Sequence, residues 1–211
     1  MVRHTLLWLR AFVSRITGSL TIVYTIEAHL GRGEDLRIVG GASPWGLGAY
    51  LMRGTSIVAW YATAIGDFEA VLMKHEIGSH CGQQVWEAMN LLIALRTWKC
   101  HWSRVRVKLE VRADNVAALT LVASLRGRGF ALNLIARELA LDLGDGSFRP
   151  DVCSHSPGAA SKIADALSLK VQPGARFEVP ALLHNVKAVV VPMRIAEFFL
   201  SLDTAAMHVA T

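Results

Sequence analysis

Charged side chains and cysteines are both scarce in this sequence. Aspartate, glutamate, lysine and arginine make up 18% of the 211 residues, whereas 53% are hydrophobic. That balance supports a packed core and argues against global disorder. The three cysteines (Cys81, Cys100 and Cys153) are far apart and form no CxxC pair, so neither a disulfide framework nor a zinc knuckle is expected. Reduced thiols indicate an intracellular protein, cytoplasmic or nuclear.

Long apolar runs and N-terminal acids are also missing. No uninterrupted apolar run reaches the length of about 18 residues that a transmembrane helix needs, so no membrane partner is expected. Residues 1–26 contain three arginines and no acid. An organellar transit peptide shares that composition; the alternative is a segment that packs on, or once joined, a preceding domain. The net charge of +5 allows a polyanionic partner without establishing one.

The first half of the chain predicts three strands and a long helix. Short segments rich in β-branched and aromatic residues predict an antiparallel meander at about 36–42, 47–53 and 56–63. Residues 65–80 lack a clean period and are expected to form a connection with one helical turn. The following segment, about 83–99, has apolar residues at helical spacing and no internal glycine or proline, which predicts a largely buried helix.

The second half alternates between strands and helices. Residues 105–114 alternate between apolar and mostly charged side chains, which predicts a strand with one buried and one cationic face. Asp114 is placed to cap a helix over 115–125. The other expected elements are two helices and a strand, at 131–143, 160–169 and 152–155. The order β-β-β-α-β-α-α-β-α predicts an α/β fold with a five-stranded mixed sheet and helices on its faces.

One hairpin carries a family pattern. The stretch from Arg37 to Leu51 (RIVGGASPWGLGAYL) predicts a strand, a tight turn that glycine permits, and a returning strand. It resembles the first hairpin of the ribonuclease H domain in retroelement polyproteins, whose pattern is apolar-apolar-x-Asp-Ala-Ser-x-x-Gly-x-Gly. Gly41 occupies the position of the aspartate in that pattern.

Three further strings resemble the same family in the same order. They are VWEAMNLLIAL with Glu87, VRADNVAAL with Asp114, and HSPGAASKIADALS with Asp165. The last is the most specific, although Ser161 stands where asparagine is usual. Over about residues 24–195 the chain looks most like the ribonuclease H domain of a gypsy- or copia-like LTR-retrotransposon reverse transcriptase polyprotein. A degenerate fragment of such a polyprotein also fits.

The resemblance implies hydrolysis of the RNA strand of an RNA–DNA hybrid by two Mg²⁺ or Mn²⁺ ions. Glu87, Asp114 and Asp165 would be the catalytic acids and the metal ligands, and the carboxylate that bridges both ions would be missing at Gly41. Each acid also has an ordinary interpretation. Glu87 could be a solvent-facing helix residue, Asp114 a helix cap and Asp165 a surface residue.

No nearby acid replaces the missing carboxylate. Glu110 shares a face with Asp114 but lies about 13 Å away along the strand, and Asp35 is also out of reach of the position of Gly41. We therefore expect a ribonuclease H-like domain that binds RNA–DNA hybrid with impaired catalysis. The alternative is a non-catalytic structural or connection remnant of a polymerase polyprotein. A third interpretation, an unrelated α/β binding protein in which the matching strings are a coincidence, would be supported if the three acids were far apart in the fold.

The sequence suggests a division into three parts and several secondary candidates. Residues 1–35 would connect to a preceding reverse transcriptase domain, 36–170 would form the ribonuclease H-like domain, and 171–211 would be a tail. His155 is interpreted as a structural histidine beside a turn at Pro157-Gly158. Candidates for contact with a nucleic-acid backbone are Gln83, Lys108, Arg112 and Asn115.

Overall fold

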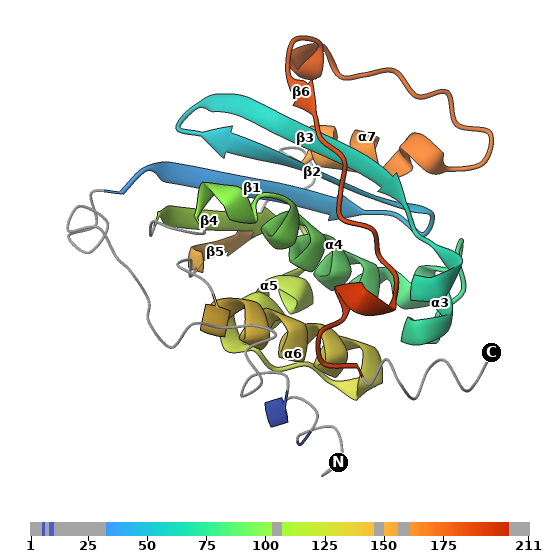
Figure 1. Ribbon diagram of the computed structural model, residues 1–211. Helices are drawn as coiled ribbons and strands as arrows, with labels where there is room; N and C mark the ends of the chain where they lie inside the picture. Colours follow the sequence, from blue (N-terminus) through green and yellow to red (C-terminus); the bar gives the residue numbers. More distant parts are fainter. Residues whose placement is uncertain are drawn as a thin grey trace.

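A mixed β-sheet separates two unequal layers of helices (Figure 1). The computed structural model describes residues 6, 9–10, 33–102, 107–145, 150–155 and 161–202. The strands are β1 (Asp35–Ala42), β2 (Gly46–Arg53), β3 (Ser56–Ala64), β4 (Lys108–Ala113), β5 (Pro150–His155) and β6 (Lys187–Ala188). The helices are α3 (Asp67–Met73), α4 (Gln83–Thr97), α5 (Val116–Ser124), α6 (Gly129–Asp145) and α7 (Lys162–Ser168).

The strand order is β5-β4-β1-β2-β3-β6. Strands β1, β2 and β3 form an antiparallel meander, and β4 and β5 continue the sheet in parallel from β1. The predicted five-stranded mixed sheet is therefore confirmed, and it has the ribonuclease H-like arrangement that the resemblance implies. The two-residue strand β6, which pairs with β3, was not predicted because its segment carries no strand pattern.

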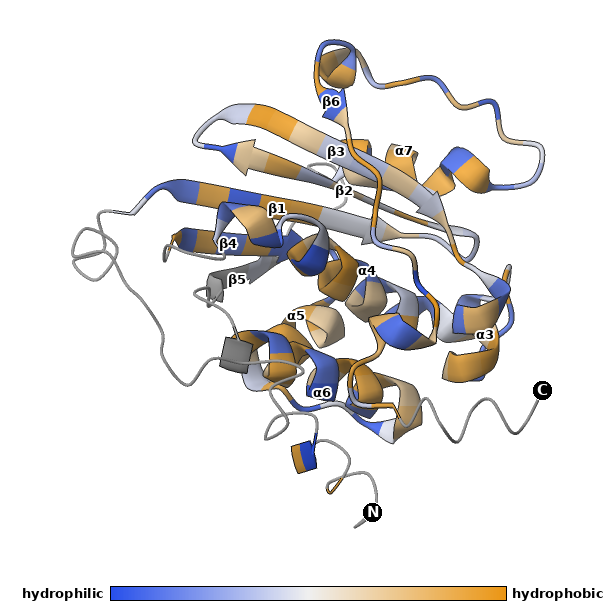
Figure 2. Ribbon diagram, viewed as in Figure 1, coloured by the Kyte–Doolittle hydropathy of each residue, from blue (hydrophilic) through white to orange (hydrophobic). Residues whose placement is uncertain are grey.

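Helix α4 forms the centre of the thicker layer, with α5 and α6 beside it (Figure 1). Every residue of α4 from Val85 to Leu95 is buried, which confirms the predicted buried helix. Strand β4 shows the predicted alternation, with Leu109, Val111 and Ala113 fully buried and the residues between them more exposed (Figure 2). One apolar cluster therefore fills the space between this layer and the sheet.

Helix α7 covers the opposite face of the sheet, over β1 and β2. A Cβ atom added to Gly48 on β2 would lie 2.4 Å from the Cβ of Leu167. Only glycine fits at that distance, so the residue lets α7 approach the strand closely. A second, smaller apolar cluster lies under α7 and is made of Val39, Tyr50, Trp60, Ala164, Leu167 and Leu183.

The connection after the meander contains more helix than the predicted single turn. Residues Asp67–Met73 form α3, because the buried carboxylate of Glu69 accepts a hydrogen bond from the Gly66 N–H at 2.7 Å and closes the first turn. Glu69 also pairs with Arg194 at 2.6 Å, so the contact that holds α3 comes from the C-terminal segment. In the part of the chain that the structure describes, no helix has both the length and the apolar character needed to cross a membrane.

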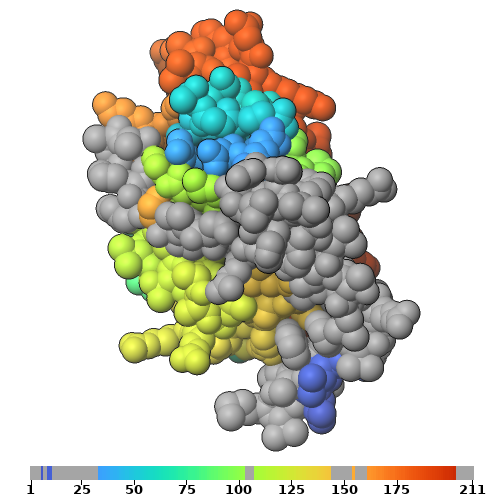
Figure 3. Space-filling view, turned by 90° about the vertical axis from the view of Figure 1, so that its left-hand side faces the viewer, coloured from blue at the N-terminus to red at the C-terminus, as the bar shows by residue number. Residues whose placement is uncertain are grey.

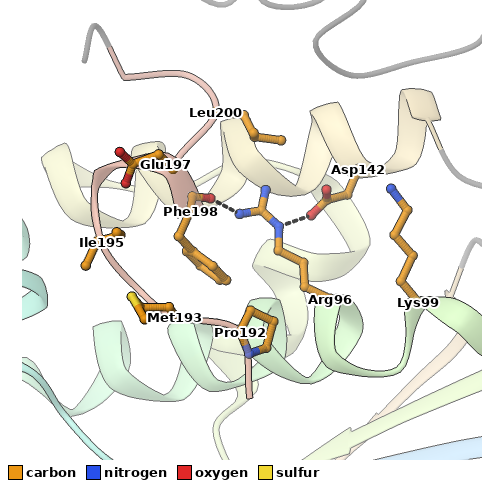
Figure 4. Close-up of a pocket in the computed structure, with 9 residues that line it drawn as sticks. All are labelled: Arg96, Lys99, Asp142, Pro192, Met193, Ile195, Glu197, Phe198 and Leu200. Atoms are coloured by element: carbon orange, nitrogen blue, oxygen red, sulfur yellow. Dashed lines mark hydrogen bonds and ion pairs between the residues drawn. The ribbon is translucent and has the colours of Figure 1, made fainter. Parts of the chain in front are cut away.

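The C-terminal segment is attached to the helical layer by hydrogen bonds to ion-paired side chains of α4 and α6. Arg96 on α4 contacts Glu138 at 2.8 Å and Asp142 at 2.7 Å, both on α6, and donates a hydrogen bond to the Phe198 carbonyl (Figure 4). Glu138 in turn accepts hydrogen bonds from the N–H groups of Leu200 and Ser201. A pocket of about 400 Å³ lies beside these contacts, and none of the three predicted catalytic acids lines it.

Candidate active site

Asp165 faces the position where the family pattern places its first aspartate. Helix α7 carries Asp165 across β1, and a Cβ atom added to Gly41 would lie 3.2 Å from Asp165 Oδ1. The same Cβ would lie 3.2 Å from the Ala164 carbonyl carbon, so a side chain at position 41 needs a shift of a few tenths of an ångström. The empty position on β1 and the acid on α7 therefore belong to one site.

Glu87 reaches the same end of β1 from α4. Its exposed fraction is 2%, so the interpretation as a solvent-facing residue is wrong. Its Oε1 atom accepts hydrogen bonds from the Ala42 N–H at 2.9 Å and from Gln83 Nε2 at 3.1 Å. Gln83 Nε2 also donates to the Ala42 carbonyl at 2.7 Å. Helix α4 thus holds a carboxylate against the last residue of β1.

Asp114 is exposed and directly follows β4. It does not cap the next helix. Asn115 does, because its side chain accepts hydrogen bonds from the Ala117 and Ala118 N–H groups at 2.9 and 3.1 Å. The predicted cap is therefore wrong by one residue, and no described residue hydrogen-bonds to the Asp114 carboxylate. Since β1 and β4 are parallel, Asp114 and the empty position at Gly41 lie at the same edge of the sheet.

The charges of the three acids act on one another. Burial and the negative charges of Asp114 and Asp165 together raise the pKa of Glu87 to about 8, against the lowering effect of its hydrogen bonds. Burial and the charge of Asp114 raise the pKa of Asp165 to about 6. Because these effects require proximity, Glu87, Asp114 and Asp165 converge from three elements on one end of the sheet. Distant acids would have supported an unrelated α/β binding protein, and the structure does not provide that support.

The donor atoms at this site suit a hard divalent cation. Within the described part of the chain, Glu87 Oε2 and Gln83 Oε1 are buried and have no hydrogen-bond partner. An unpartnered buried oxygen is costly, and Mg²⁺ and Mn²⁺ prefer oxygen ligands. In those same residues, however, no group of three or more His, Cys, Asp or Glu is arranged to hold one ion. The acids therefore share a region without closing around a common centre.

Asn90 is a supporting residue that the sequence analysis missed. It is fully buried in α4, and its Nδ2 atom donates hydrogen bonds of 2.9 Å to the carbonyls of Gly41 and Gly48. Its Oδ1 atom accepts one of 2.7 Å from the Tyr61 hydroxyl. A Cβ atom at Gly40 would lie 2.9 Å from Asn90 Nδ2, so Gly40 makes room for this contact. A lone asparagine in an otherwise apolar helix was the available signal.

The side chain of His155 and the turn at Pro157-Gly158 lie outside the described residues. Three of the four predicted nucleic-acid contacts lie near the acids, whereas Lys108 lies at the opposite end of β4, level with Asp35. Gln83 belongs to the site itself, Asn115 is the helix cap next to Asp114, and Arg112 lies one position before Ala113 at the end of β4.

Comparisons with known proteins find similar solved structures but no matching sequence family. No protein-family model and no curated protein matches the sequence. Among solved structures, the chain is similar to RNase H1 from the halophilic archaeon Halobacterium salinarum, with 19% identity, 67% of this chain and 98% of that chain covered, and a TM-score of 0.48. The chain is also similar to LC11-RNase H1 in complex with RNA/DNA hybrid, with 17% identity, 64% of this chain and 92% of that chain covered, and a TM-score of 0.49.

A third solved structure is similar to this chain to a comparable degree. The N-terminal RNase H domain of a Mycobacterium tuberculosis protein, solved as a fusion with maltose binding protein, is 18% identical, with 63% of this chain and 95% of that chain covered and a TM-score of 0.44. The strand order and helix placement of this chain are those of a ribonuclease H-like fold. Identities and scores this low assign no activity to this chain.

Proposed function

We propose that this chain binds RNA–DNA hybrid as a ribonuclease H-like domain of retroelement origin. Glu87, Asp114 and Asp165 would hold Mg²⁺ or Mn²⁺, which supplies two-metal phosphodiester hydrolysis in intact relatives. The convergence of these acids beside the empty position at Gly41 carries the proposal. In that setting residues 1–35 would connect to a preceding reverse transcriptase domain.

The site is expected to bind a metal ion more readily than to cleave. Glu87 is held by Ala42 and Gln83 with one oxygen turned away from these partners, while Asp114 is exposed and has no hydrogen bond from the described residues. Both can supply ligands. A carboxylate between them at position 41 is missing, so two ions have no shared ligand and the attacking water has no fixed place.

Restoring that carboxylate tests the proposal. Gly41→Asp places a carboxylate next to Asp165, where the neighbouring Ala164 backbone has to move by a few tenths of an ångström. We expect cleavage of the RNA strand of a labelled hybrid, dependent on Mg²⁺ or Mn²⁺, at a rate at least about a hundred times that of the unchanged chain. Gly41→Asn is the matched control, because it has the same shape and no charge, and it should not cleave.

The outcomes separate the possible interpretations. Cleavage by Gly41→Asp alone supports the assignment and identifies the missing ligand. Equal cleavage by the unchanged chain would show that another group completes the site. If both variants fold, bind Mn²⁺ in calorimetry and do not cleave, a hybrid-binding domain without catalysis remains. If none of them binds metal or hybrid, the alternative of a structural or connection remnant of a polymerase polyprotein takes its place.

A further inference from the structure

Two arginines and a glutamate lie on the sheet face next to the acids. Arg37 on β1 is level with Glu110 on β4, and Val39 is level with Arg112. Side chains two residues apart point to the same face of a strand. Val39 lies on the same face of β1 as Arg37 and packs against α7. The three charged side chains therefore lie on the sheet face that α7 covers, next to this helix. We call Arg37, Glu110 and Arg112 the arginine cluster.

The arginine cluster carries one net positive charge. Glu110 accepts hydrogen bonds from Arg37 Nε at 2.5 Å, from Arg112 Nε at 2.7 Å and from the Ser154 hydroxyl at 2.9 Å. Although its partial burial alone would raise the pKa of Glu110, these hydrogen bonds lower it to about 2. The carboxylate therefore stays ionised and neutralises one guanidinium, while the charge of the other remains.

The cluster also keeps hydrogen-bond donors available. Glu110 engages only the Nε atom of each arginine, and the one other contact among described residues is a long one from Arg37 Nη1 to the Met52 sulfur at 3.9 Å. The terminal amino groups of Arg112 donate to no described residue, and 37% of that side chain is exposed. Donors that point away from the carboxylate can therefore take a second anion.

Tyr50 adds a hydroxyl to the same place. Tyr50 lies on β2, level with Val39 on the neighbouring strand β1, and forms no hydrogen bond with a described residue. Burial raises the pKa of Tyr50, the charges of Arg112 and Arg37 lower it, and the charge of Asp165 raises it. The hydroxyl is therefore within electrostatic range of both guanidinium groups on one side and of the α7 acid on the other.

We propose that Arg112, Arg37 and the Tyr50 hydroxyl bind a backbone phosphate of the nucleic-acid strand, one phosphate away from the acids. A guanidinium presents paired donors that match phosphate oxygens. Arg112 precedes Asp114 by two residues, or about 7 Å along the strand, which is comparable to the spacing of successive phosphates in one strand. The inference rests on the proposed function, because metal ions at the acids would hold the neighbouring phosphate.

A pocket lies beyond the arginine cluster, toward the start of β1. This pocket of about 290 Å³ is lined by Arg37, Thr55, Lys108 and Glu110 together with Asp35, Leu36 and Gly54. It opens where the start of β1 meets the β2–β3 turn, at the end of the sheet that faces the viewer in Figure 3, with β1 in blue and the turn in cyan. Lys108 pairs there with Asp35 at 3.4 Å, with both side chains more than half exposed.

Binding of a fluorescent RNA–DNA hybrid, measured by anisotropy across a range of salt concentrations in Mg²⁺, tests the inference. Arg112→Gln should weaken binding about ten-fold and reduce the salt dependence by about one counterion. Glu110→Gln should have the opposite effect, because it raises the net charge of the cluster while keeping an acceptor oxygen. Arg137→Gln, on α6 in the layer on the other face of the sheet, is the matched control and should bind like the unchanged chain.

Opposite signs for Arg112→Gln and Glu110→Gln support the phosphate site, since a loss of local structure would weaken binding in both. If the unchanged chain binds hybrid and Arg112→Gln binds equally well, the inference is overturned while the proposed function stands. If the unchanged chain does not bind hybrid, the proposed function fails. In that case, nuclear magnetic resonance of the arginine Nε signals during titration with inorganic phosphate tests the anion site by itself. Shifts at Arg37 and Arg112 support the site, and unchanged signals overturn it.

Discussion

The side-chain amide of Asn90 donates a 2.9 Å hydrogen bond to the Gly41 carbonyl. The same amide group holds the Gly48 carbonyl, so one residue of α4 fixes both strands of the hairpin at the point where they carry no side chains. The backbone of β1 is therefore positioned by a polar residue within the apolar helical layer. That arrangement keeps position 41 in place whether or not a carboxylate is present.

Asn90→Leu should lower the free energy of unfolding by about 2–4 kcal/mol, because it removes two hydrogen bonds to carbonyls and leaves the buried Tyr61 hydroxyl with one acceptor fewer. Urea denaturation measures the change. Asn133→Leu is the control, since Asn133 is exposed on α6 and makes one local hydrogen bond to the Gly129 carbonyl; it should change stability by about 0.5 kcal/mol or less. Equal effects of the two substitutions would contradict the role given to Asn90.

Arg96→Met should lower the free energy of unfolding by about 3–5 kcal/mol. The arginine side chain is 10% exposed, and its removal leaves Glu138 and Asp142 buried without their cation. The exposed pair of Arg53 and Glu34 is the comparison, and Arg53→Met should cost about 1 kcal/mol or less. Limited proteolysis should also cut Arg96→Met near Phe198 sooner than the unchanged chain. Stability equal to that of Arg53→Met would contradict this prediction.

Chain order and local periodicity account for what the sequence predicted well. The β1–β3 meander, α4 and the alternation of β4 each depend on residues close together in the sequence, and all were predicted to within a few residues. The positions of Glu87, Asp114 and Asp165 came from short motifs, and the structure brings them within electrostatic range. Their role as metal ligands stays a prediction.

Contacts between distant segments account for what the sequence could not predict. Strand β6 forms only because Ala188 is level with Trp60 on β3, more than a hundred residues earlier. Glu69 and Arg194 likewise have no local signal, since each is an ordinary charged residue until the fold pairs them. Asp114 was expected as a helix cap because either Asp114 or Asn115 suits that role, and the choice depends on where β4 ends.

Glu87 should make the protein less stable as the pH rises. Its pKa is about 8 in the folded protein, well above the ordinary value of 4.5, so between these values the folded state holds a proton that the unfolded chain has lost. The free energy of unfolding therefore falls as the pH rises through this window. Urea denaturation at about pH 5, 7 and 9 without divalent ions should show this fall, and Glu87→Gln should reduce it.

Glu76 provides the control for the pH dependence that we assign to Glu87. Glu76→Gln removes an exposed acid from the loop before α4 and should leave the pH dependence of the unchanged chain intact. If Glu76→Gln and Glu87→Gln show the same pH dependence, Glu87 does not hold its proton in the folded state. A steeper fall in Glu87→Gln would contradict the sign of the effect.

Mn²⁺ should stabilise the folded chain through the acids. An ion that binds only the folded state at about ten times its Kd adds about 1.4 kcal/mol. Asp114→Asn should abolish that gain without a large cost of its own, because Asp114 is exposed. The gain should grow between about pH 6 and 8, since the ion has to displace the proton that Glu87 holds. Thermal unfolding with and without Mn²⁺ measures both effects, and Asp67→Asn, an exposed acid at the start of α3, is the control. A gain that persists in Asp114→Asn and vanishes in Asp67→Asn would place the ion elsewhere.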